Sequence, residues 1–146
     1  MVPFARGSFK NVWRGDYTDP PRLGEECVAK VFKTGSVFQD HFFELEMTVI
    51  EETQKIINAW NDARVFGWPV MLSIPQIWTY EANGEKCLIE PFIRNFQKFN
   101  SNSGWVKFPG TQWSDVLQAL SHFSYHHSGG ERLLCDIQGG IYSDRL

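Results

Sequence analysis

The chain has 146 residues, of which 42% are hydrophobic and 21% charged, so its size and composition are those of one folded domain rather than a disordered segment. A formal net charge of −3 gives no reason to expect a nucleic-acid-binding surface. The longest apolar stretch, VFGWPVML, is too short to cross a bilayer, and the N-terminus has no apolar run of signal-peptide length. We therefore expect an intracellular, cytoplasmic domain without nucleic-acid or membrane partners.

The first half of the chain predicts two strands and a long helix. Strands are expected in SFKNVWRGDY (8–17) and CVAKVFK (27–33), with a proline- and glycine-containing turn between them. Apolar residues then recur at three- and four-residue steps over 37–64, which predicts one amphipathic helix with Ser36 as its N-cap. The predicted apolar stripe consists of Phe38, Phe42, Leu45, Val49, Ile56, Trp60 and Ala63.

The second half predicts a hairpin, a second helix and a last strand. IPQIWTYE (74–81) and EKCLIEPFI (85–93) flank Ala82-Asn83-Gly84, a favourable hairpin turn. A polar loop (97–104) follows, and then a helix over 114–126 that ends at Ser128-Gly129-Gly130. RLLCDIQ (132–138) predicts the last strand, so the order β-β-α-β-β-α-β indicates an α+β fold.

The three cysteines, Cys27, Cys87 and Cys135, each lie in an apolar, strand-like run and form no C-x-x-C pair. This pattern favours buried free thiols in a reducing compartment over a disulfide framework.

Two charged residues interrupt apolar strand segments. Lys30 in CVAKVF could hold an ammonium group against the phosphates of a nucleotide, or it could simply extend its stem along a strand face. Glu90, in CLIEPFI, stands where the chain leaves a strand before Pro91, a position open to a nucleotide base or only to solvent.

Asp136 and Gln138 in CDIQGG are two residues apart, so in a strand their oxygens would point to one face and could bind one Mg²⁺ ion or one hydroxyl. The alternative is a polar strand end before a glycine turn. Asp136 follows an apolar triplet, and a carboxylate buried there is costly unless a metal or a donor satisfies it. His122 is expected on the inner side of the second helix, where a hydrogen-bonded core histidine is the usual finding.

Five stretches together resemble, in the same order, the alpha-kinase family of atypical serine/threonine kinases, which includes myosin heavy chain kinases and elongation-factor-2 kinase. They are PFARGSFK, ECVAKVFK, CLIEPFI, FQKFNSNSGW and ALSHFSYHHSGGERLLCDIQGG. The resemblance implies an atypical protein-kinase-like fold within one incomplete domain, 1–146. Its N-lobe, an antiparallel sheet with a long helix, would occupy about 1–94, and a partial C-lobe about 95–146.

The resemblance also assigns nucleotide-binding residues in the first part of the chain. Residues 4–10 look like the family's phosphate-covering loop, with Lys10 where the family more often has arginine. Lys30 matches the lysine that contacts ATP phosphates and also serves catalysis. Glu90 matches the hinge glutamate at the base.

In the second part, residues 98–104 resemble the loop near the catalytic cleft. Asp136 matches the catalytic aspartate and a ligand of Mg²⁺, and Gln138 matches a neighbouring residue of the magnesium site. His122 matches one of four zinc ligands, so a structural Zn²⁺ is expected only in a complete domain.

The sequence departs from the family pattern at its end. The family continues with a Thr-Asp-Pro segment and a His-x-Cys-x-x-x-Cys zinc segment, neither of which follows here, and Asp144 lacks the proline that would mark it as a metal ligand. The expected partners are ATP, Mg²⁺ and a protein substrate with serine or threonine. The two hypotheses are a kinase that transfers the γ-phosphate, and a truncated, inactive remnant that binds nucleotide or protein.

Overall fold

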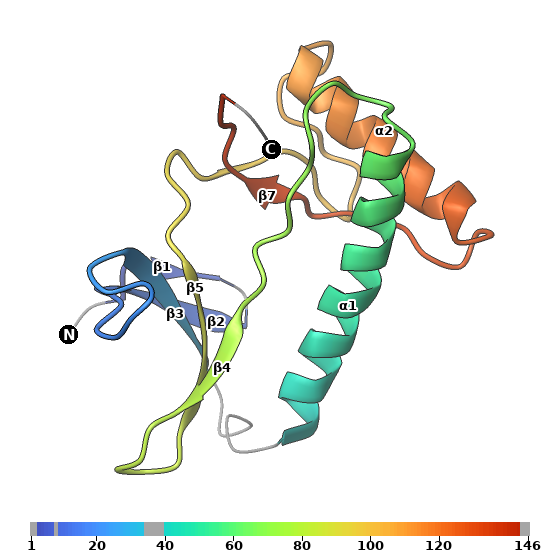
Figure 1. Ribbon diagram of the computed structural model, residues 1–146. Helices are drawn as coiled ribbons and strands as arrows, with labels where there is room; N and C mark the ends of the chain where they lie inside the picture. The colour runs from blue at the N-terminus through green and yellow to red at the C-terminus, as the bar shows by residue number, and fades with distance from the viewer. Residues whose placement is uncertain (1–2, 8, 34–39, 144–146) are drawn as a thin grey trace. The chain divides into compact units, whose positions relative to one another are not determined.

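The computed structural model describes residues 3–7, 9–33 and 40–143 (Figure 1). Among them it forms an α+β fold, as predicted, in two compact units: residues 1–50 with 73–92, and residues 51–72 with 93–146. The elements are β1 (Ala5–Arg6), β2 (Lys10–Asp16), β3 (Glu26–Phe32), α1 (Asp40–Asp62), β4 (Gln76–Thr79), β5 (Lys86–Pro91), β6 (Gln97–Lys98), α2 (Gln112–His127) and β7 (Gln138–Gly139). The lobe boundary expected near residue 94 lies close to the 92/93 junction, but residues 51–72, expected in the N-lobe, belong to the second unit.

The first unit contains a five-stranded antiparallel sheet with the order β1-β2-β3-β5-β4. Strand β3 alternates between its two faces, and Cys27, Ala29 and Val31 pack on one face in a buried cluster. The other members of this cluster are Tyr17, Cys87 and Ile89. The predicted burial of Cys27 and Cys87 as free thiols is confirmed.

The predicted hairpin turn joins β4 and β5. The Tyr80 N–H donates to the Glu85 carbonyl at 2.8 Å, and the Gly84 N–H donates to the Tyr80 carbonyl at 2.8 Å. The Asn83 side-chain oxygen also accepts from the Glu85 N–H at 3.0 Å. This turn sets the register in which β5 passes between β3 and β4.

The long helix is confirmed, but its predicted apolar stripe is only partly right. Leu45 and Val49 are exposed by 61% and 64%, whereas Phe43 and Ile57, which the stripe omitted, are buried. The cause is that the first turns of α1 belong to one unit and its later turns to the other, so one periodic stripe cannot describe both. The predicted N-cap, the helix start at 37 and Phe38 lie outside the described residues. No helix in the described part of the chain is both long and apolar enough to span a membrane.

The second unit packs the later turns of α1 with α2. Its buried cluster comprises Ile57, Trp60, Val70, Phe99, Leu117 and Leu120. The rings of Trp60 and Phe123 meet edge to face at 5.5 Å, and Phe123 was among the predicted inward residues of α2. Helix α2 ends before Ser128-Gly129-Gly130, as predicted. The Gly130 N–H donates to the Tyr125 carbonyl at 2.8 Å, and Gly130 has a φ of 85°, a backbone conformation that favours glycine.

The predicted strand over 132–138 is wrong except for its last residue. In the segment before β7, side chains of α2 and of its C-cap residue accept hydrogen bonds from two backbone N–H groups. The Arg132 N–H donates to Ser128 Oγ at 2.9 Å, and the Leu134 N–H donates to Ser124 Oγ at 2.8 Å. Cys135, predicted to be a buried thiol, is therefore exposed.

Candidate functional site

Three predicted site residues share one face of the five-stranded sheet. Lys30 on β3 lies opposite Val12 on β2, and Glu90 on β5 lies opposite Val28 on β3. Opposite residues of antiparallel strands point to the same face, and residues two apart along one strand do so as well. Lys10, two residues before Val12, is therefore on the face that carries Lys30 and Glu90.

Lys30 and Glu90 form an ion pair between Lys30 Nζ and Glu90 Oε1. The Glu90 side chain is only 11% exposed, so its charge needs this partner, and Ser73 Oγ adds a long donation to Oε2 at 3.4 Å. The interpretation of Glu90 as a merely solvated strand end is wrong. Lys30 is 33% exposed, and its ammonium ends at a carboxylate rather than in bulk solvent.

Lys10 is held by the first turns of α1. Its ammonium forms an ion pair with Glu46 and lies 5.0 Å from the centre of the Phe32 ring. Gly7 N–H donates to the Lys10 carbonyl at 2.8 Å, so the segment expected to cover phosphates forms the tight connection between β1 and β2.

The second unit brings together Asp136, Gln138 and a third residue, Lys98. Lys98 on β6 lies opposite Gln138 on β7, and its ammonium forms an ion pair with Asp136 Oδ1. The sequence named Lys98 only as the first residue of a loop, and no local pattern revealed that it would meet Asp136.

Two predictions about Asp136 are wrong. Its side chain is 49% exposed rather than buried, and its negative charge is paired with the ammonium group of Lys98. It also precedes β7, with a φ of 60°, so the two-residue strand period does not relate it to Gln138.

His122 is exposed, not on the inner side of α2. The buried residues Leu117, Leu120 and Ser124 define the inner side, and His122 follows Leu120 by two residues, or about 200° around the helix. Its ring lies 4.4 Å from that of His126. Among the described residues no three His, Cys, Asp or Glu side chains gather as a metal site.

The opposite face of the sheet carries the buried thiols of Cys27 and Cys87. Burial raises the pKa of Cys87 above its ordinary value of 9.0 and does the same for Cys27. Burial likewise raises the pKa of the Tyr80 and Tyr17 hydroxyls above 10.0. At neutral pH these four groups are therefore protonated and uncharged.

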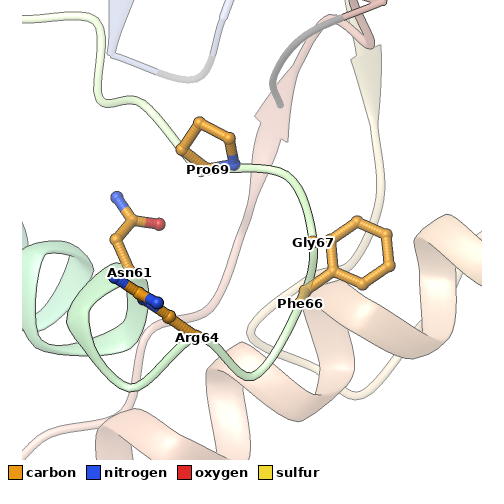
Figure 2. Close-up of a pocket in the computed structure, with 5 residues that line it drawn as sticks. All are labelled: Asn61, Arg64, Phe66, Gly67 and Pro69. Atoms are coloured by element: carbon orange, nitrogen blue, oxygen red, sulfur yellow. The ribbon is translucent and has the colours of Figure 1, made fainter.

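One surface hollow lies away from the predicted site residues. It has a volume of about 280 Å³ and is lined by Asn61, Arg64, Phe66, Gly67 and Pro69, at the end of α1 and in the loop after it (Figure 2). The Asn61 carboxamide is occupied there, because it both donates to and accepts from the backbone of Val70 at 2.8 and 2.9 Å. None of the predicted site residues lines this hollow.

These features define an α+β protein with an ion-paired lysine in a five-stranded antiparallel sheet and an ion-paired aspartate beside a short two-stranded sheet. The sequence model of the alpha-kinase family matches residues 5–145, and the chain belongs to this family.

Curated relatives agree with this assignment. The chain is 28% identical over 145 residues to myosin heavy chain kinase B of Dictyostelium discoideum, an alignment that covers 94% of the chain and 19% of that protein. It is 30% identical over 154 residues to myosin heavy chain kinase C of the same organism, covering 98% of the chain and 18% of that protein. The chain thus spans about a fifth of these relatives.

Solved structures share the fold. An alpha kinase from Entamoeba histolytica superimposes with a TM-score of 0.75 at 20% identity, covering 100% of this chain and 60% of that one. The inactive alpha-kinase domain of myosin heavy chain kinase A in complex with ATP gives a TM-score of 0.70 at 22% identity, covering 98% and 69%.

Proposed function

We propose that the chain belongs to an atypical serine/threonine protein kinase that transfers the γ-phosphate of ATP to serine or threonine hydroxyls of a protein. The observation that carries the proposal is the Lys30–Glu90 ion pair, on the sheet face that also holds Lys10, in a chain of the alpha-kinase family. The solved alpha-kinase domain in complex with ATP supports ATP as the nucleotide. The cytoplasm, which supplies ATP and Mg²⁺ and keeps thiols reduced, is the proposed location.

The sheet face of the first unit would bind the nucleotide. Lys30 offers an ammonium to phosphate oxygens, and Lys10 offers a second cation from the neighbouring strand. Glu90 lies at the end of β5, where we propose that it meets the base. Both lysines already carry a carboxylate partner. The phosphates would replace the more exposed Glu46 at Lys10, whereas Lys30 would bind phosphate while it keeps its contact with Glu90.

The two-stranded sheet of the second unit, with Asp136 beside it, would bind the metal and the substrate hydroxyl. The oxygens of Asp136 and Gln138 suit Mg²⁺, which takes oxygen ligands and usually keeps several waters. Bound Mg²⁺ would neutralise charge on the phosphates. Asp136 would also orient the attacking hydroxyl and accept its proton, the part that a catalytic aspartate plays in phosphoryl transfer.

A phosphorylation assay with a matched control tests the proposal. The chain is incubated with magnesium-ATP and a basic protein and is compared with Asp136→Ala and with Asp62→Ala, an exposed aspartate at the end of α1. We expect phosphate transfer to fall to background in the first variant and to stay unchanged in the second. Equal transfer in all three proteins contradicts the role of Asp136, and no transfer by the unmodified chain favours the remnant that binds without turnover.

A further inference from the structure

Asn100, in the loop after β6, is a buried polar residue with every side-chain group occupied. It is 4% exposed. Its Nδ2 donates to Gln118 Oε1 at 2.7 Å and to Ser121 Oγ at 3.2 Å, both on α2. Its Oδ1 accepts the Ile137 N–H at 2.8 Å. One carboxamide therefore joins its own loop to a helix and to the segment before β7.

The residue that Asn100 holds lies between the two candidate magnesium-site residues. The Ile137 carbonyl accepts the Phe99 N–H at 2.9 Å, so both backbone groups of Ile137 are bound by two consecutive loop residues. Because the N–H and the carbonyl of Ile137 are both held by hydrogen bonds, the backbone at Ile137 constrains the positions of its neighbours Asp136 and Gln138.

The neighbouring residue Lys98 completes the arrangement. It binds the Asp136 carboxylate and lies opposite Gln138, so residues 98–100 bind residues 136–138 at three successive points. Asn100 also forms hydrogen bonds to α2, and Phe99 packs in the cluster that contains the buried Leu117 and Leu120 of that helix. Asp136 has a left-handed φ of 60°, a conformation that a non-glycine residue keeps only where its surroundings enforce it.

We propose that Asn100 is a positioning residue for phosphoryl transfer: through Ile137 it ties Asp136 and Gln138 to the rigid helix α2. The inference rests on the function proposed above for those two residues. It assigns Asn100 no contact with ATP, with the metal or with the substrate. A shift of catalytic oxygens by about 1 Å can lower a rate by about a hundredfold, so loss of this link should act mainly on kcat.

Amide exchange in the nucleotide-free protein tests the link itself. In Asn100→Ala the Ile137 amide should exchange at least about tenfold faster than in the unmodified chain, because its acceptor is gone. In Asn100→Asp, which keeps an acceptor oxygen, it should remain close to the original rate. The Leu134 amide, bound by Ser124, is an internal reference and should not change.

Kinetics test the consequence. Asn100→Ala should lower kcat at least about tenfold with a smaller change in KM for ATP, and Asn100→Asp should restore part of the loss. Asn58→Ala, which removes an exposed asparagine of α1, is the matched control and should keep both constants. If Asn100→Ala does not fold, Asn100→Ser, whose hydroxyl is too short for the same partners, takes its place.

Three results would overturn the inference, and the first two concern Ile137 and kcat. One is an unchanged exchange rate at Ile137 in Asn100→Ala, and the other is faster exchange there with an unaltered kcat. Equal acceleration at Ile137 and Leu134 would also overturn it, since it indicates general loosening. If the unmodified chain transfers no phosphate, the proposed function fails, and the exchange rates alone then support or overturn the attachment of Ile137 to Asn100.

Discussion

Gly140, which follows β7, is the position where a single methyl group should destabilise the second unit most clearly. It is buried, and a Cβ atom there would lie 2.7 Å from the Arg94 carbonyl oxygen and 2.8 Å from Cγ2 of Ile93. The ring of Tyr142 would lie at 3.3 Å. The first contact is with backbone, which cannot turn aside as the end of a flexible side chain can. Gly140→Ala must therefore move the chain at residues 93–94 or at β7.

The cost can be worked from these contacts. Overpacking by one or a few methylene-sized groups costs about 1–3 kcal/mol. For a chain of 146 residues this corresponds to a fall in Tm of roughly 3–10 °C. Gly139→Ala is a matched control in the adjacent residue, because its Cβ would meet nothing within 4 Å. That variant should keep its Tm or raise it slightly, since alanine restricts the unfolded chain by about 0.4–1 kcal/mol relative to glycine.

Thermal unfolding of the three proteins, followed by circular dichroism at one heating rate, decides the matter. Equal Tm values for Gly140→Ala and Gly139→Ala would refute the argument, because they would show that the chain at residues 93–94 yields without cost. A fall in both variants would refute it as well, since the open position would then be as sensitive as the crowded one.

Three further predictions concern nucleotide binding by the first unit, the reactivity of the thiols and the pH dependence of stability. ATP at a hundredfold its Kd should stabilise the chain by about 2.7 kcal/mol, which a thermal-shift assay would measure. This stabilisation should be lost in Lys30→Met. It should be kept in Lys33→Met, because Lys33 is an exposed lysine just beyond β3. Iodoacetamide at pH 8 should label Cys135 first, with Cys27 and Cys87 labelled only on unfolding, as peptide mass spectrometry would show. Because burial raises the pKa of both buried thiols, they ionise first in the unfolded chain, and the free energy of unfolding should fall as the pH rises past about 9.

Local periodicity correctly predicted which residues face inward in those elements that pack against a single core. Strand β3 alternates between charged and apolar faces, and the inward residues of α2 include Leu117 and Leu120, both buried. Periodicity failed for Leu45 and Val49, because it cannot reveal that one helix serves two cores. The local pattern identified Lys30 as a charged residue within an apolar strand. It could not reveal the ion pair of Lys30 with Glu90, because that contact depends on the register of β5 against β3, which is a non-local property.

The segment before β7 shows a different limit. Its apolar residues satisfied a strand pattern, yet its Arg132 and Leu134 N–H groups are bound by Ser128, the residue that follows α2, and by Ser124, which lies four residues earlier within the helix. A serine row at helical spacing is the local signal for such a contact, and it was present in the sequence. Asn100 had no such signal, because in a polar loop nothing separates it from Asn102.

The two candidate sites share one electrostatic design. Lys30 is paired with Glu90, and Lys98 is paired with Asp136, so in each unit the group proposed to act is already neutralised within the ligand-free chain. Half-exposed pairs of this kind contribute about 1 kcal/mol or less, so a triphosphate or a divalent cation can replace the partner at little cost. The Glu90 carboxylate is the exception: it is 11% exposed, and an unpaired charge there is unfavourable. Lys30 must therefore keep contact with Glu90 while it binds phosphate, which its three ammonium donors allow.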